Sequence, residues 1–138
     1  MSDTTTEYKL PLPRRHGMAA EFYAFCRKHE LRFQRCVDCG TWRHIPREMC
    51  AHCGSVRTEW AKSSGRGKLF SWTTVRQPML PQFEVPYSPV VIELDEGVRL
   101  LSWLTDLGPD DLVLDMPVEV VFDDVTAEVT LPKFKRRA

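Results

Sequence analysis

The sequence contains no apolar run approaching the roughly 20 residues that a membrane-spanning helix requires. Its opening stretch, MSDTTTEYKLPLPRRHG, lacks the apolar core of a secretory signal, and we expect these residues, 1–17, to form a flexible arm. The expected location is therefore the cytoplasm, where clustered cysteines bind metal more often than they form disulfides. We expect no association with a membrane.

Recognisable catalytic motifs are also missing. The sequence has no nucleophile elbow, no His–Glu metal motif and no pair of carboxylates at a spacing that would bring them together. The stretch SGRGK, residues 64–68, is too short for a phosphate-binding loop and leads into a predicted strand instead of a helix. We therefore identify no catalytic residue.

Cysteine is scarce, with five in 138 residues, yet four of the five lie within 18 positions. They follow the pattern Cys36-x2-Cys39-x10-Cys50-x2-Cys53, in which each pair belongs to one tight turn followed by glycine. Two such turns supply four thiolates, the ligand set of a tetrahedral zinc site. A mononuclear iron site or an iron–sulfur cluster would share this pattern. A zinc ion with four protein ligands has no open position for water, so we predict one structural zinc ion.

Charge is unevenly distributed along a chain whose formal net charge is zero. Residues 1–76 carry 14 Lys and Arg against 7 Asp and Glu, whereas residues 77–131 carry 1 against 12. The basic part could bind an anion, and the acidic part would repel a phosphate polymer. Basic side chains near the cysteines and in the SGRGK stretch are either phosphate ligands or solvated charges. These candidates are Arg43, Arg47, Arg66 and Lys68.

The stretch MAAEFYAFCRKHELRF, residues 18–33, has apolar side chains at helical spacing, and we predict a helix there. Its apolar stripe is unusually aromatic, with Phe22 and Phe25 on it and Tyr23 at its side. These rings either pack on the chain's own domain or dock on another protein, because aromatic residues are favoured at interface centres. All three are candidate interface residues. Residues 34–62 follow as the predicted zinc ribbon.

Residues 63–138 have the pattern of a second module made of short strands. Five stretches are rich in β-branched and aromatic side chains or alternate apolar with polar residues, and no long helix interrupts them. These stretches are 69–75, 87–94, 98–104, 116–124 and 127–132. Five short strands predict a small antiparallel barrel of the OB-fold type, so the expected fold class is mainly β.

A proline-rich loop, residues 76–86, joins the first two predicted strands. Its apolar side chains Met79, Leu80 and Phe83 have no periodic pattern that would place them in a strand. Such a loop either covers the barrel mouth or contacts a partner. The three residues are therefore further candidates for a partner interface.

An OB-fold raises the alternative of single-stranded nucleic-acid binding, which needs a positive groove with aromatic side chains along it. The aromatic residues of this barrel could all belong to the core, and Arg99 is the only cation between residues 77 and 131. An acidic barrel is a poor track for a polyanion. We therefore expect no nucleic acid as a partner.

The order of motifs is specific: an aromatic helix, LRFQRCVDCG, CAHCGS, SGRGKLFSWTTV, PYSPVVIELDEGVRLLSW and MPVEVVF. Over roughly residues 18–135 it resembles a family of acyl-CoA-associated proteins with a rubredoxin-like zinc ribbon and a C-terminal OB-fold. The cysteine spacing is common to many ribbons. The ribbon followed by SGRG and ELDEGVRLL is much more particular.

The resemblance implies an accessory subunit that completes the acyl-CoA site of a thiolase-like partner, an aldolase or a thiolase, or of an enoyl-CoA hydratase. Members are generally not catalysts by themselves, and several serve in the breakdown of steroid side chains. A hetero-oligomer is therefore expected, with acyl-CoA as ligand. The resemblance assigns the metal role to the four clustered cysteines. It implies that the anion bound by the four basic candidates is coenzyme A. It carries over no catalytic residue.

Overall fold

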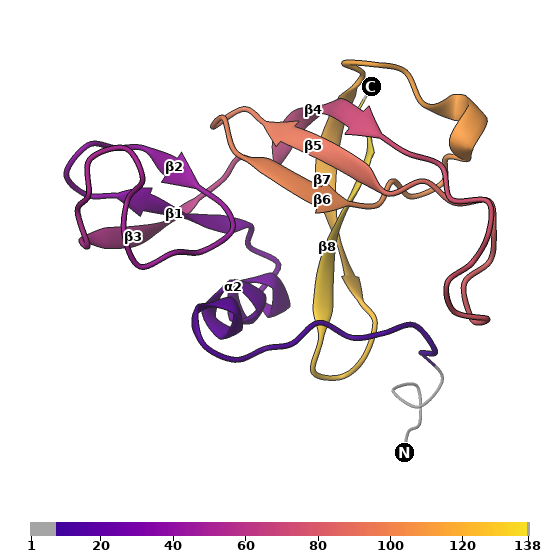
Figure 1. The fold of residues 1–138 in the computed structure, drawn as a ribbon, viewed down its shortest axis with the longest axis horizontal. Coiled ribbons are helices and arrows are strands. Elements are labelled where there is room, and N and C mark those ends of the chain that lie inside the picture. The colour runs from indigo at the N-terminus through magenta and orange to yellow at the C-terminus, as the bar shows by residue number, and fades with distance from the viewer. Residues whose placement is uncertain (1–7, 138) are drawn as a thin grey trace.

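The computed structural model describes residues 8–137, and its fold is built mainly from strands, with one α-helix beside them (Figure 1). The helix α2, Met18–Arg27, is followed by a three-stranded sheet of order β2-β1-β3 and a five-stranded sheet of order β6-β5-β4-β7-β8. The mainly β architecture expected from the sequence is confirmed. Residues 1–7 of the predicted arm lie outside the described residues. The strands and the short 3-10 helix η1 are β1 Arg32–Cys36, β2 Trp42–Arg43, β3 Thr58–Lys62, β4 Arg66–Trp72, β5 Val90–Leu94, β6 Arg99–Ser102, η1 Pro109–Asp111, β7 Pro117–Asp124 and β8 Thr130–Arg136.

The helix is shorter than predicted. The sequence indicated a helix to residue 33, but α2 ends at Arg27 and His29 adopts a left-handed φ of 59° that stops it. Strand β1 then begins at Arg32, and Phe33 lies opposite Ala61 of β3 with its side chain fully buried. The pairing with a strand 28 positions later along the chain overrides the helical spacing, which is a local signal.

The five-stranded sheet contains all five predicted strands, with their ends shifted by a few residues. β4 lies in the centre and pairs antiparallel with β5 and β7, while β6 and β8 form the two edges. The sheet curls into a half-barrel, so that the edges meet at a parallel bridge between Leu104 and Phe134 (Figure 1). The barrel expected from the sequence is therefore present as a curled, partly open sheet.

One hydrophobic core joins the helix, the ribbon and the half-barrel. Phe22 and Cys26 of α2 and Phe33 of β1 belong to the same buried cluster as Ile92 and Phe134 of the large sheet. In Figure 1 the helix lies between the two sheets, and it packs against β1 and β8. The helix therefore fixes the ribbon on the barrel.

Candidate metal centre and neighbouring groove

The four clustered cysteines converge on one point. All four sulfur atoms lie within 4.8 Å of one another, and the Cys36–Cys53 and Cys39–Cys50 sulfur pairs are each 3.6 Å apart. A tetrahedron with metal–sulfur bonds of about 2.3 Å has edges of about 3.8 Å, so these distances suit zinc. Residues following each pair hold the turns closed: the backbone N–H groups of Gly40 and Gly54 donate to the carbonyl oxygens of Cys36 and Cys50, both at 2.9 Å.

Backbone N–H groups favour negative charge on part of the cluster. The N–H of Cys39 lowers the pKa of the Cys36 thiol to about 6, and the N–H of Cys53 likewise lowers the pKa of Cys50. The N–H of Ser55 lowers the pKa of Cys53, but the neighbouring thiol of Cys36, burial and the other sulfurs outweigh it and raise that pKa to about 12. Four thiolates so close together need a cation between them, as a zinc ion provides.

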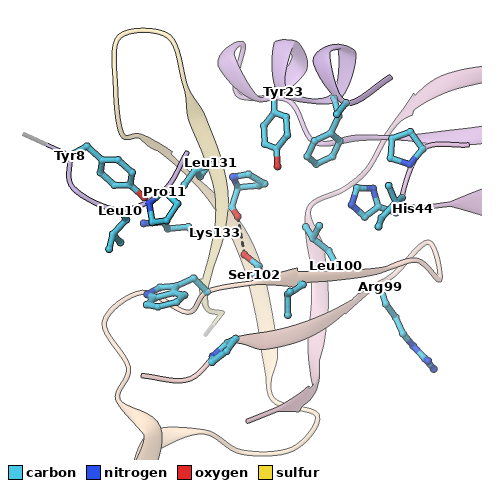
Figure 2. A pocket seen from close by; sticks show the side chains of 18 of the residues that line it. Tyr8, Leu10, Pro11, Tyr23, His44, Arg99, Leu100, Ser102, Leu131 and Lys133 are labelled. Carbon is cyan, nitrogen blue, oxygen red and sulfur yellow. Dashed lines mark hydrogen bonds between the residues drawn. The ribbon is translucent and has the colours of Figure 1, made fainter. Parts of the chain in front are cut away.

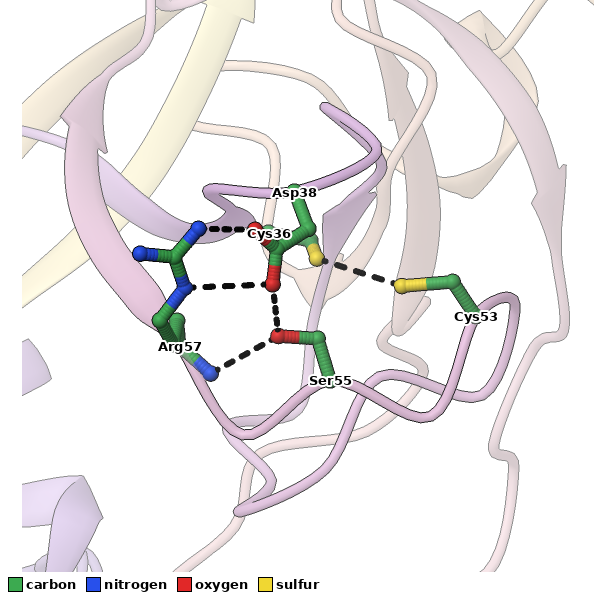
Figure 3. Close-up of polar contacts among 5 residues, drawn as sticks. All are labelled: Cys36, Asp38, Cys53, Ser55 and Arg57. Atoms are coloured by element: carbon green, nitrogen blue, oxygen red, sulfur yellow. Dashed lines mark hydrogen bonds and ion pairs between the residues drawn. The ribbon is translucent and has the colours of Figure 1, made fainter.

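Beside the cluster, three polar residues tie the two cysteine turns together (Figure 3). Asp38 lies in the first turn, while Ser55 and Arg57 follow the second. The Arg57 guanidinium and the Ser55 hydroxyl both donate to the Asp38 carboxylate, with 3.2 Å between Arg57 Nε and Asp38 Oδ2. Arg57 and then Ser55 lower the pKa of Asp38 to about 2. The two turns are therefore linked by an ion pair as well as by the convergence of their cysteines.

The basic candidates differ in how free their charges are. Arg43 is half-buried, donates from Nε to the side-chain oxygen of Gln34 at 2.8 Å and from Nη2 to the carbonyl oxygen of Arg47 at 2.9 Å. The structure thus gives Arg43 a role inside the ribbon. Lys68 lies 3.6 Å from Glu93 and 3.8 Å from Asp115.

The side chains of Arg47 and Arg66 are exposed, and neither forms a salt bridge with any residue in the described range, 8–137.

Gln34 is a structural residue that sequence reasoning missed. It is 2% exposed, and its side-chain oxygen also accepts the backbone N–H of Arg47 at 2.8 Å. A lone Gln in a strand carries no signal of this kind.

The aromatic candidates on the helix separate into buried and accessible rings. Phe22 is 4% exposed and packs against Phe33 and His44, so its ring is part of the chain's own core, and it also lines the groove described below. Tyr23 and Phe25 are half-buried. Phe25 packs against Trp60, with ring centroids 5.6 Å apart. Packing on the chain's own domain is therefore observed for Phe22, while docking of the three rings on a partner stays a prediction.

The loop 76–86 presents apolar side chains outward. Met79 is 90% exposed and Leu80 39%. Phe83 is half-buried because its ring stacks on Tyr87, which in turn stacks on Trp103, with centroid distances of 5.4 and 5.2 Å. This row of three rings fixes the loop on the half-barrel. It leaves Met79 free to contact another molecule.

A groove of about 850 Å³ lies where the arm, α2, the ribbon and the barrel edges meet (Figure 2). Its walls are mainly apolar, and they come from segments far apart in the sequence, including Tyr8, Tyr23, Leu101, Trp103 and Leu131. A second cavity of about 500 Å³ shares Phe83 and Trp103 with it. Nothing in the sequence pattern indicated this groove.

His44 is a further groove residue that the sequence did not mark. Burial lowers its pKa to about 4, so the imidazole is neutral at pH 7. Its Nδ1 atom is buried without a hydrogen-bond partner among the described residues.

Outside the zinc cluster, Cys26 is fully buried, and burial raises its pKa to about 12, so its thiol is protonated and unreactive. Among residues 8–137, no helix is both long and apolar enough to cross a membrane.

Two family models match successive parts of the chain. Residues 24–58 match the rubredoxin-like zinc ribbon domain of ChsH2, and residues 60–123 match the C-terminal OB-fold domain of ChsH2. The ribbon match and the four converging sulfurs together identify a structural zinc site. The prediction of zinc from the cysteine spacing is confirmed.

Among curated relatives, the chain is 34% identical over 125 residues to the "Probable enoyl-CoA hydratase alpha subunit" of Thermomonospora curvata, covering 91% of this chain and 39% of that protein. It is 37% identical over 105 residues to the "3-oxo-4,17-pregnadiene-20-carboxyl-CoA hydratase alpha subunit" of Mycobacterium tuberculosis, covering 76% and 33%. The chain thus spans about two fifths or less of these two relatives. It is 32% identical over 111 residues to a "DUF35 domain-containing scaffold protein" of Methanothermobacter thermautotrophicus, of which it covers 83%.

Among solved structures, the chain superposes with a TM-score of 0.81 and 34% identity on a chain described as "Ltp2-ChsH2(DUF35) aldolase", covering 92% of this chain and 98% of that one. A DUF35-family protein of Sulfolobus solfataricus superposes with a TM-score of 0.60 at 14% identity, covering 86% and 84%. At that identity the second match supports the fold alone.

Proposed function

Because this chain belongs to the ChsH2 family of zinc-ribbon and OB-fold proteins, we propose that it is a non-catalytic accessory subunit of an enzyme acting on acyl-CoA. The partner in this proposal is a thiolase-like aldolase or thiolase, with an enoyl-CoA hydratase as the next class. The observation that carries the proposal is the superposition, over nearly the full length of both chains, on a ChsH2 DUF35 chain described as part of an aldolase.

The metal centre supports a role without catalysis. Four cysteine ligands fill the coordination sphere of zinc, so the ion has no open position at which a water or a substrate oxygen could be activated. Zinc sites of this kind contribute folding free energy, roughly 10 kcal/mol or more in zinc-finger peptides. The chemistry of the assembly therefore belongs to the partner, and this chain supplies surfaces.

Two groups of side chains are suited to these surfaces. The apolar loop residues Met79 and Leu80 are exposed, which makes them suitable for contact with the partner enzyme. The cations of Arg47 and Arg66 are exposed and form no salt bridge within residues 8–137, so they can approach the phosphates of coenzyme A. Arg43 and Lys68 are weaker candidates, because the first is hydrogen-bonded inside the ribbon and the second lies between two carboxylates.

The names of the relatives suggest the kind of acyl group. One is named as a hydratase subunit for a pregnadiene carboxyl-CoA, which is a steroid acyl-CoA. We extend that substrate class to this chain's assembly: a coenzyme A thioester of a steroid side chain or another bulky lipid acid. The location in the cytoplasm follows only as part of this proposal, since acyl-CoA is used there.

The proposal is tested by isolating the affinity-tagged chain from its source organism and weighing the intact assembly by native mass spectrometry. We expect one zinc ion per chain, an aldolase, thiolase or hydratase identified by peptide sequencing, and turnover of acyl-CoA only when both chains are present. Met79→Lys should weaken this assembly, while Val113→Lys, at a 60% exposed position, serves as the matched control. A chain that elutes alone, or that converts acyl-CoA unaided, would refute the proposal.

A further inference from the structure

The free edge of β6 faces the groove. β6 is the edge strand of the large sheet and pairs only with β5 among the described strands. Leu94 donates its N–H to Val98 at 2.9 Å, so the alternating hydrogen bonds to β5 fall on the even-numbered residues of β6, beginning with Leu100. The backbone N–H and C=O groups of Arg99 and Leu101 therefore point away from β5, into the groove.

The seam between β6 and β8 closes at one end only. Phe134 donates its N–H to Trp103 at 2.9 Å and accepts the N–H of Thr105 at 2.8 Å. One step further, the Ser102 hydroxyl donates to the carbonyl oxygen of Pro132 at 2.8 Å. Pro132 has no N–H to return a hydrogen bond, so β8 cannot continue the ladder toward Leu101.

From Ser102 back to the start of β6 at Arg99, no backbone hydrogen bond joins β6 to β8 within the described part of the chain. The seam therefore opens into the groove that Figure 2 shows, next to Leu100 and Ser102 and opposite Leu131 and Lys133.

The groove suits an uncharged apolar segment. Leu101 is 71% exposed on its rim, which is unusual for a leucine on an open strand edge. The two cations lining the groove are already paired: Arg99 lies 3.8 Å above the ring of Phe70 and bonds to Glu93, and Lys133 bonds to Asp123 at 2.6 Å. A phosphate or carboxylate ligand would have to break these pairs, whereas a neutral peptide would not.

We propose that an extended, uncharged segment of the partner enzyme binds in this groove as an added strand on β6, hydrogen-bonded to Arg99 and Leu101. Main-chain hydrogen bonds to a free sheet edge give affinity, and the apolar walls accept alternate side chains of the segment. This inference rests on the proposed function and names the contact that joins the two chains. Binding of such a segment would account for both the unpaired edge of β6 and the exposed Leu101 beside it.

Hydrogen–deuterium exchange tests the inference on the assembly isolated with the tagged chain. The Leu101 amide should exchange at least about 100-fold more slowly in the assembly than in the free chain, because it donates to the added strand. Exchange of this amide at the same rate in both states would overturn the inference and leave the proposed function standing. Failure to isolate any aldolase, thiolase or hydratase would overturn both.

Other occupants give different results. Protection of the Leu101 amide in the free chain at every concentration would mean that the chain's own residues fill the groove. Protection that grows with the concentration of the free chain would mean a second copy. Either result would overturn the inference.

A pair of charge substitutions provides the second measurement. Leu101→Lys places an unpaired charge at the edge that the added strand must approach, and the dissociation constant for the partner enzyme should rise at least about tenfold. Leu114→Lys, at a 60% exposed leucine outside the groove, is the matched control and should leave the constant within about twofold. Equal effects of the two variants would count against the groove as the docking site.

Discussion

The substitution Gly67→Ala tests how closely two strands approach in the centre of the half-barrel. Gly67 lies on β4, opposite Leu94 of β5 and Val118 of β7. A Cβ atom at this position would lie 2.9 Å from the Leu94 Cα atom and 3.0 Å from the Glu93 carbonyl carbon, and closer still to the Glu93 carbonyl oxygen. These are backbone atoms of a paired strand, so no side chain can rotate away to make room.

The expected cost follows from that geometry. Forcing extra atoms into a packed region usually costs about 1–3 kcal/mol, and here the strands themselves must separate, so we expect a loss at the upper end, about 3 kcal/mol. With an m-value of about 2 kcal/mol/M, the midpoint of urea unfolding should fall by about 1.5 M. Tryptophan fluorescence of the zinc-loaded protein measures this transition.

Gly108→Ala is the matched control. Gly108 has an ordinary extended backbone with φ of −90°, and an added Cβ would meet only an Asp111 carboxylate oxygen at 3.6 Å. Its unfolding free energy should stay the same or rise by up to about 1 kcal/mol, because alanine restricts the unfolded chain. If the unfolding free energy of Gly67→Ala lies within about 0.5 kcal/mol of the wild-type value, the inferred close approach of β4 and β5 at Gly67 is wrong.

Three further predictions concern the metal and pH. Cys39→Ser should lower the zinc content from about one ion per chain, measured by elemental mass spectrometry, while Cys26→Ala should not, because Cys26 lies outside the cluster. The pKa of His44 is about 4 in the folded chain and about 6.5 in the unfolded chain. As the pH falls, the unfolded chain therefore binds the proton first, and stability that is present above pH 6.5 is lost as the pH falls toward 4. Replacing this residue with Phe should reduce that loss by up to about 3 kcal/mol in urea titrations; equal losses in both proteins would contradict the burial of the imidazole. The Thr130 hydroxyl lowers the pKa of Asp124, so Asp124→Asn should lower the melting temperature at pH 7, and the difference from wild type should vanish as pH falls below that pKa.

The parts of the fold that sequence reasoning predicted are those with short-range causes. The Cys-x2-Cys spacing fixes two turns by itself, and the positive φ values of Gly40 and Gly54, 78° and 80°, are the conformation that only glycine adopts readily. Strand alternation likewise located the five strands of the large sheet. The end of the helix was missed because Phe33 fits a helical stripe equally well, and only its pairing with Ala61 decides for a strand.

The groove and its edge were not predictable from the sequence, because their causes are long-range. The open seam depends on Pro132 lying opposite Ser102, 30 positions away, and the walls come from segments between Tyr8 and Lys133. Likewise, the sequence could not show whether the charge of Arg43 is free, and the structure shows that its guanidinium donates to the side chain of Gln34. A basic residue near an anionic metal site has the same sequence signal whether it is solvated or hydrogen-bonded inside the chain.

Zinc and the groove are physically connected through the ribbon. The ten residues between Cys39 and Cys50 include the short strand β2 and lie between two of the cysteine ligands, and His44 and Ile45 of this segment line the groove. The side-chain oxygen of Gln34 also holds this segment, because it accepts hydrogen bonds from Arg43 Nε and from the backbone N–H of Arg47. The opposite walls belong to β6 and β8, which the large sheet holds without the metal. Because one wall is continuous with the cysteine ligands and the other is not, we expect zinc removal to loosen the ribbon wall of the groove and, under the proposal above, to weaken binding of the partner's segment.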